Sequence, residues 1–132
     1  MKQETKAFLE MLASRRAAQL EKQDPTVRAL HVVDEHSPRA VVKTERQGKV
    51  VAFEFIETAE TAALQCNMED YVFVANEFGD VTVALPASSY ARDIAATVLT
   101  DLKGRIRRSG AIGEFRFSGY LYDEMGNFKK LM

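Results

Sequence analysis

Cysteine and proline are scarce in this sequence. Cys66 is the only cysteine among 132 residues, so no disulfide can form within the chain. Small domains of oxidising compartments depend on disulfides, and we therefore expect a cytoplasmic protein. The three prolines and seven glycines are spread along the chain, and no low-complexity tract interrupts it.

Long apolar runs and an excess of one charge sign are absent as well. No uncharged run approaches the ~20 residues that a membrane-spanning helix needs, so we expect no membrane contact. The first ten residues mix Lys2, Glu4 and Lys6 with apolar side chains, which does not match the continuous apolar stretch of a signal peptide. The net charge of −1 indicates no class of partner. The hydrophobic content of 46% is typical of a folded protein, and the length predicts a single domain spanning residues 1–132.

Apolar residues recur every three or four positions within residues 4–22, with charged residues between them. This spacing predicts an amphipathic helix. The helix should end at Asp24, because Pro25 has no N–H for the helical ladder and disfavours the helical conformation in the residue before it.

The period changes to two between residues 27 and 85, where β-branched and aromatic residues are frequent. Val51, Phe53 and Phe55, for example, would share one face of an extended segment. The predicted strands cover residues 28–34, 39–45, 49–57, 62–67, 71–76 and 81–85. Because the connections between them are too short for parallel crossovers, we expect an antiparallel meander of about six strands.

A second amphipathic helix is predicted after Pro86. Ser88 or Ser89 can cap its N-terminus, and Gly110 suits the position just beyond its C-terminus. Its apolar stripe comprises Ala91, Ile94, Ala95, Val98, Leu102 and Ile106. Residues 114–122 alternate again, and a turn at residues 125–127 predicts a C-terminal β-hairpin. The expected fold class is α+β: an N-terminal helix, the antiparallel meander, the second helix packed on the sheet, and the hairpin.

Residues 31–36 form the densest group of side chains that can bind a metal or transfer protons. They would have to converge on one point to do so. On an extended strand, His31 and Glu35 point to the side opposite Asp34 and His36, so we predict no metal, no cofactor and no catalytic residue. An enzyme or metal-binding protein that uses His31, Glu35 and His36 is the third functional hypothesis. Cys66 is interpreted as a small buried side chain.

A basic cluster near the end of the second predicted helix is the strongest functional signal. Its members are Lys103, Arg105, Arg107, Arg108 and Arg116. Glycines and alternating aromatic residues follow it, and such groups can contact phosphates and stack on bases. The same cations also suit the negative end of a helix dipole. Residues 49–86 carry a local charge of −6, which repels phosphates, whereas residues 87–132 carry +3.

We expect a non-catalytic protein-interaction or adaptor module that acts as a homodimer. The N-terminal helix has more apolar circumference than one packing face needs, and the outer strands of a meander need to be covered. The basic end of the second helix would contact an acidic partner. The alternative is an accessory nucleic-acid-binding protein that uses the same five cations.

Overall fold

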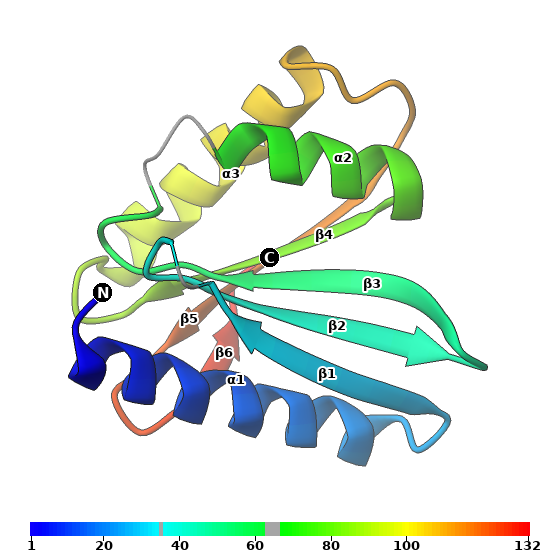
Figure 1. Cartoon of the computed structure of the whole chain (residues 1–132). Coiled ribbons are helices and arrows are strands. Elements are labelled where there is room, and N and C mark those ends of the chain that lie inside the picture. Colours follow the sequence, from blue (N-terminus) through cyan, green and yellow to red (C-terminus); the bar gives the residue numbers. More distant parts are fainter. Residues whose placement is uncertain (35, 63–66) are drawn as a thin grey trace.

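The computed structural model describes residues 1–34, 36–62 and 67–132, in which helices cover both faces of one sheet (Figure 1). The helices are α1 (Gln3–Gln23), α2 (Met68–Phe78) and α3 (Arg92–Arg108). The strands are β1 (Val27–Val33), β2 (Ala40–Arg46), β3 (Lys49–Ile56), β4 (Asp80–Pro86), β5 (Arg116–Tyr122) and β6 (Phe128–Lys130). Among these residues, no helix combines the length and the apolar character needed to cross a bilayer.

The sheet is mixed, and its strands follow the order β1-β2-β3-β4-β5-β6. β1, β2 and β3 pair antiparallel, β4 pairs parallel with both β3 and β5, and β6 is antiparallel to β5. The predicted antiparallel meander is therefore wrong beyond β3. α2 connects β3 to β4 and α3 connects β4 to β5, and each helix returns the chain to the same end of the sheet, as a parallel pair requires.

The strand predicted for residues 71–76 is wrong, because this segment belongs to α2. The buried residues of α2 recur at helical spacing and are Met68, Tyr71, Val74 and Ala75. The helix ends at Gly79, whose φ of 67° is the left-handed conformation of a C-cap. Most of the strand predicted for residues 62–67 lies outside the described part of the chain, because residues 63–66 are not described.

Other parts of the prediction are confirmed. These are the N-terminal helix α1, the five strands β1 to β5, and the second predicted helix, which is α3. α3 differs in detail, because its N-cap is Ala91 instead of a serine. Its buried stripe includes Leu99, whereas Ile94 is 55% exposed. The second arm of the predicted C-terminal hairpin is only the short strand β6, which pairs antiparallel with β5.

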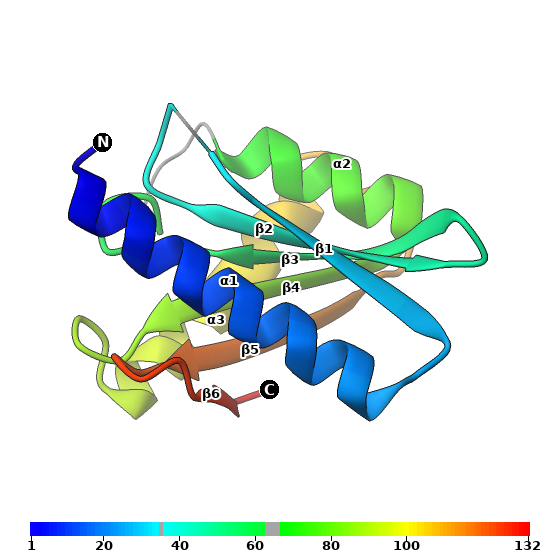
Figure 2. The same cartoon turned by 60° about the horizontal axis from the view of Figure 1, so that its bottom comes forward.

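Two hydrophobic cores occupy the two faces of the sheet. α1 crosses one face, where Leu9 and Leu12 pack with Ile56 (Figure 2). α2 and α3 lie on the other face (Figure 1), where Leu99 is fully buried. α3 approaches β5 closely because Gly119 has no side chain, and a Cβ there would lie 2.5 Å from Leu99 Cδ1.

Candidate functional site

The basic cluster predicted from the sequence is divided between the two faces of the molecule. The last two turns of α3 carry four of its members: Lys103, Arg105, Arg107 and Arg108. The fifth, Arg116, begins β5 and lines a cleft between α1 and the sheet, together with Arg16 and Tyr120. Its neighbour Phe117 faces the core under α2 and α3. Arg116 therefore lies on the opposite face of the sheet from the cations of α3.

The cations of α3 also point in more than one direction. Residues 103 and 107 are one turn apart on one flank of the helix, and residues 105 and 108 occupy another flank. Arg107 has a long ion pair with Glu114, at 3.7 Å, and its guanidinium lies 5.8 Å from the ring centroid of Phe115. The cations at the end of α3 thus lie on more than one flank of the helix.

The residues of the third hypothesis do not converge in the described part of the chain. His31 is an exposed residue of β1, and His36 is exposed in the turn that follows this strand. Glu35 lies outside the described residues. Within the described residues, no group of three or more His, Cys, Asp or Glu side chains is arranged to hold a metal ion. Cys66 also lies outside the described residues, so its predicted burial stays a prediction.

The structure instead assembles a buried ionic cluster around Arg39, which precedes β2. Arg39 Nε and Nη2 donate to the two carboxylate oxygens of Glu57, at 3.0 and 2.8 Å, in a two-point ion pair. Nη1 donates to Asp70 at 2.7 Å and to Asn67 at 3.2 Å. The guanidinium also lies 4.8 Å from the ring centroid of Phe55. This cluster lies where β1 and β3 end, the end of a parallel sheet at which α/β proteins commonly bind ligands.

Two tyrosines close the cluster from α2 and β5. The hydroxyl of Tyr71 donates to the Glu57 carboxylate, and the hydroxyl of Tyr122 donates to the Glu57 backbone carbonyl at 2.6 Å. Burial and then the negative charge of Glu57 raise the pKa of both phenols, so both hydroxyls stay protonated and act as donors. Glu57 is fully buried, and both its carboxylate oxygens are occupied. The carboxylate therefore joins the start of β2 and α2 to the end of β3.

A second buried ion pair lies on the opposite face of the sheet. Arg16 of α1 donates to Glu54 of β3, with Nε and Nη2 at 3.0 and 2.7 Å from the carboxylate. Its guanidinium lies 4.5 Å from the ring centroid of Tyr120 and 5.5 Å from that of Phe128. Both members of the pair line the cleft of about 420 Å³ that also contains Arg116. In this cleft, burial raises the pKa of Asp80 above its ordinary value.

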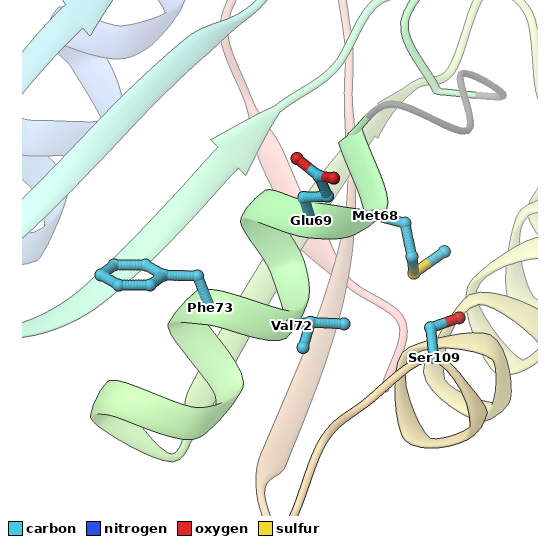
Figure 3. Close-up of a pocket in the computed structure, with 5 residues that line it drawn as sticks. All are labelled: Met68, Glu69, Val72, Phe73 and Ser109. Atoms are coloured by element: carbon cyan, nitrogen blue, oxygen red, sulfur yellow. The ribbon is translucent and has the colours of Figure 1, made fainter.

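A groove of about 490 Å³ separates α2 from the end of α3. Four residues of α2 (Met68, Glu69, Val72 and Phe73) and Ser109 at the end of α3 line it, and Figure 3 shows Met68 and Val72 directed toward Ser109. Phe73 also lines a smaller pocket next to Arg39. The two hollows beside α2 therefore share Phe73 in their linings.

The outer edge of the sheet is formed by β1. Near its start, the Ala29 N–H donates to the carboxylate of Glu21 on α1, at 2.9 Å, and so points away from β2. Backbone groups alternate along a strand, so those of His31 and Val33 face the same outer edge. The residue between them, Val32, is 57% exposed. Within the described part of the chain, the second half of β1 is therefore an open edge that carries an exposed apolar side chain.

Comparison with protein-family models, curated proteins and solved structures finds no significant match for this chain. The candidate surfaces are consequently assigned from their own geometry. Sequence reasoning missed Arg39, Glu57 and Asp70 as a group. Their one sequence signal was the predicted hairpin around residues 47–48, which brings Arg39 and Glu57 near each other across two paired strands.

Proposed function

We propose that this protein is a non-catalytic interaction module that forms a homodimer through the open edge of β1. The observation that carries this proposal is the exposure of Val32 on an edge strand whose neighbouring residues direct backbone groups outward. Unpaired strand edges associate with further strands unless they are blocked. Glu21 blocks the first half of β1, and no described residue is hydrogen-bonded to the outward backbone groups of the second half.

The sequence of this edge is compatible with pairing to a second copy of itself. In an antiparallel pair centred on Val32, His31 of each copy lies opposite Val33 of the other, and both outward-facing residues can donate and accept. The two Val32 side chains then face each other at the two-fold axis. No charged side chain opposes its own copy in this register, so the contact is apolar at its centre.

Sedimentation equilibrium of the wild-type chain and of two variants tests the dimer. The wild type should sediment as a dimer, whereas Val32→Asp and Val32→Lys should each be monomeric, because each places like charges directly opposite one another. An equal mixture of the two variants should recover the dimer, since opposite charges then meet at the axis. Ile94→Asp, at an exposed position of α3, is the matched control and should remain dimeric.

Three results would overturn the proposed dimer. They are a monomeric wild type, a Val32→Asp variant that still dimerises, and a mixture of the two charged variants that stays monomeric. The recovery by mixing is the decisive arm, because a variant that merely unfolds cannot be rescued by a second variant of the same kind.

The basic end of α3 lies in the helical layer away from the β1 edge (Figure 1), and we assign it to contact with an acidic partner protein. The alternative, an accessory nucleic-acid binder, uses the same cations. Fluorescence anisotropy of a labelled single-stranded oligonucleotide at rising salt separates the two. If the protein binds nucleic acid, the double variant Arg107→Glu, Arg108→Glu should bind more weakly and with a flatter salt dependence. The control is Arg116→Glu, on the other face of the sheet, which should leave both unchanged. If the oligonucleotide does not bind at low salt, the alternative is excluded.

A further inference from the structure

A pocket of about 230 Å³ lies between α2 and the sheet, beside the buried Arg39. Phe53 and Phe55 of β3 and Phe73 of α2 contribute its aromatic walls. Asp34, which follows β1, and Asp70, in the first turn of α2, contribute carboxylates. The volume is below the ~300–1,000 Å³ of sites for drug-sized molecules, so the pocket suits a single side chain.

The charge of the pocket favours a cation. Arg39 supplies one positive charge, and Glu57 and Asp70 are both bonded to it. Asp34 adds a further negative charge, because the backbone N–H of His36 stabilises its ionised form and lowers its pKa. The lining of the pocket thus holds two carboxylates and one guanidinium, a net charge of about −1, which repels an anion and attracts a cation.

The walls of the pocket favour a planar cation. Arg39 already lies against Phe55, 4.8 Å from its ring centroid. Phe73 is 57% exposed and borders the opening of the pocket. A guanidinium can stack on an aromatic face while it bonds to carboxylates in its own plane, whereas an ammonium is a compact and strongly hydrated charge.

We propose that this pocket binds an arginine side chain of a partner polypeptide, held between Asp34 and Asp70 and against Phe73. The proposal does not depend on the β1 dimer, because none of the pocket's residues belongs to the outer edge of β1. Asp70 is the adaptable member, since its side chain is 56% exposed and can share its carboxylate between Arg39 and an incoming guanidinium.

Titration of the ¹⁵N-labelled protein with N-acetylarginine amide, followed by NMR, tests the pocket directly. We expect saturable shifts of backbone amides near Asp34, Asp70 and Phe73, with a Kd on the order of 1 mM for a ligand of this size. N-acetylcitrulline amide is the matched ligand control, because its urea group has the shape of the guanidinium without the charge. It should cause no saturable shift.

Variants at two positions localise the binding. Asp70→Asn and Phe73→Ala should each weaken the arginine derivative at least about threefold, whereas the exposed α3 variants Asp101→Asn and Ile94→Ala should leave the affinity unchanged. Equal binding of the citrulline derivative, shifts confined to other regions, or no binding at about 20 mM would overturn the proposal. A lysine derivative that binds as tightly would overturn the assignment to arginine. Sedimentation equilibrium tests the proposed β1 dimer separately, so the failure of one proposal can be told from the failure of the other.

Discussion

The two buried ion pairs of this protein have the same chemistry and different surroundings. The pair of Arg39 and Glu57 has side chains that are 4% and 0% exposed, and Tyr71 closes it from α2. The pair of Arg16 and Glu54 borders an open cleft. Its side chains are 7% and 10% exposed, so water reaches it somewhat more than the pair of Arg39 and Glu57. Because the contribution of an ion pair depends on what replaces water around it, we expect the two pairs to contribute differently.

The two pairs also connect different parts of the fold. Arg16 joins α1 to β3, on one face of the sheet. Arg39 and Glu57 join the start of β2, the end of β3 and, through Asp70 and Tyr71, the first turn of α2. The pair of Arg39 and Glu57 therefore anchors α2, the helix that allows parallel pairing of β3 and β4, and its loss should affect more of the molecule.

The largest expected effect is that of Arg39→Met. This change leaves the fully buried Glu57 without its counter-charge, and we expect it to cost about 3–5 kcal/mol of unfolding free energy in a denaturant titration. The double variant Arg39→Met with Glu57→Met should recover much of this loss, because it removes the orphaned charge. If the double variant is no more stable than the single one, the cost does not come from unpaired charge.

Arg16→Met should cost less, about 2–3 kcal/mol, because Glu54 keeps access to the water of the cleft. The guanidinium contacts with Tyr120 and Phe128 are also lost, and the methionine side chain replaces part of them. The same titration measures the loss, and Arg15→Met at the exposed neighbouring position is the control. An effect equal to that of Arg39→Met would remove the proposed difference between the pairs.

Tyr71→Phe tests how tightly the first pair is enclosed. The substitution removes the hydroxyl that donates to Glu57 and leaves the aromatic packing against Phe55 in place. We expect a loss of about 1.5 kcal/mol of unfolding free energy, the range for a hydrogen bond to a charged acceptor. Tyr71→Phe in the Arg39→Met, Glu57→Met background should cost much less, and an unchanged cost there would show that the hydroxyl acts independently of the pair.

The smallest effect is expected at Asp80, in the cleft of Arg16. Burial raises the pKa of Asp80 in the folded state above its ordinary value of 3.8, so the folded protein loses stability as pH rises from that value through the folded-state pKa. Asp80→Asn should therefore raise the melting temperature slightly at about pH 7 and leave it unchanged at about pH 3. A lower melting temperature at neutral pH would show that the Asp80 carboxylate is stabilised by Arg116 and Lys130 more than it is penalised by burial.

Local periodicity was sufficient to predict α1, the first three strands and α3. It failed at α2, where residues 71–74 are β-branched or aromatic and therefore have strand propensity. In the folded protein this segment buries Tyr71 and Val74 against the sheet, and that burial outweighs the local preference. The error in α2 then produced the error in topology, since a helix between β3 and β4 allows parallel pairing.

The buried cluster could be predicted only in part. The turn at Gln47 and Gly48 pairs Arg46 with Lys49, and an unbroken register from that turn would place Ile56 opposite Arg39. A bulge between Thr44 and Glu45 shifts the register by one residue and brings Glu57 opposite Arg39 instead. A shift of one residue reverses which side chains meet, and the sequence contains no local signal for it.

The sequence by itself determined α1, α3 and the first three strands, because the periodicity of each is visible within one helix or one strand. Only the tertiary structure decided the helical state of α2, the order and direction of the strands, and the meeting of Arg39 with Glu57, Asp70 and Tyr71. The physical reason is that periodicity reflects contacts between residues close in the chain. Strand order and charge pairing depend instead on free energies summed over surfaces that are distant in sequence, and those surfaces meet only in the folded protein.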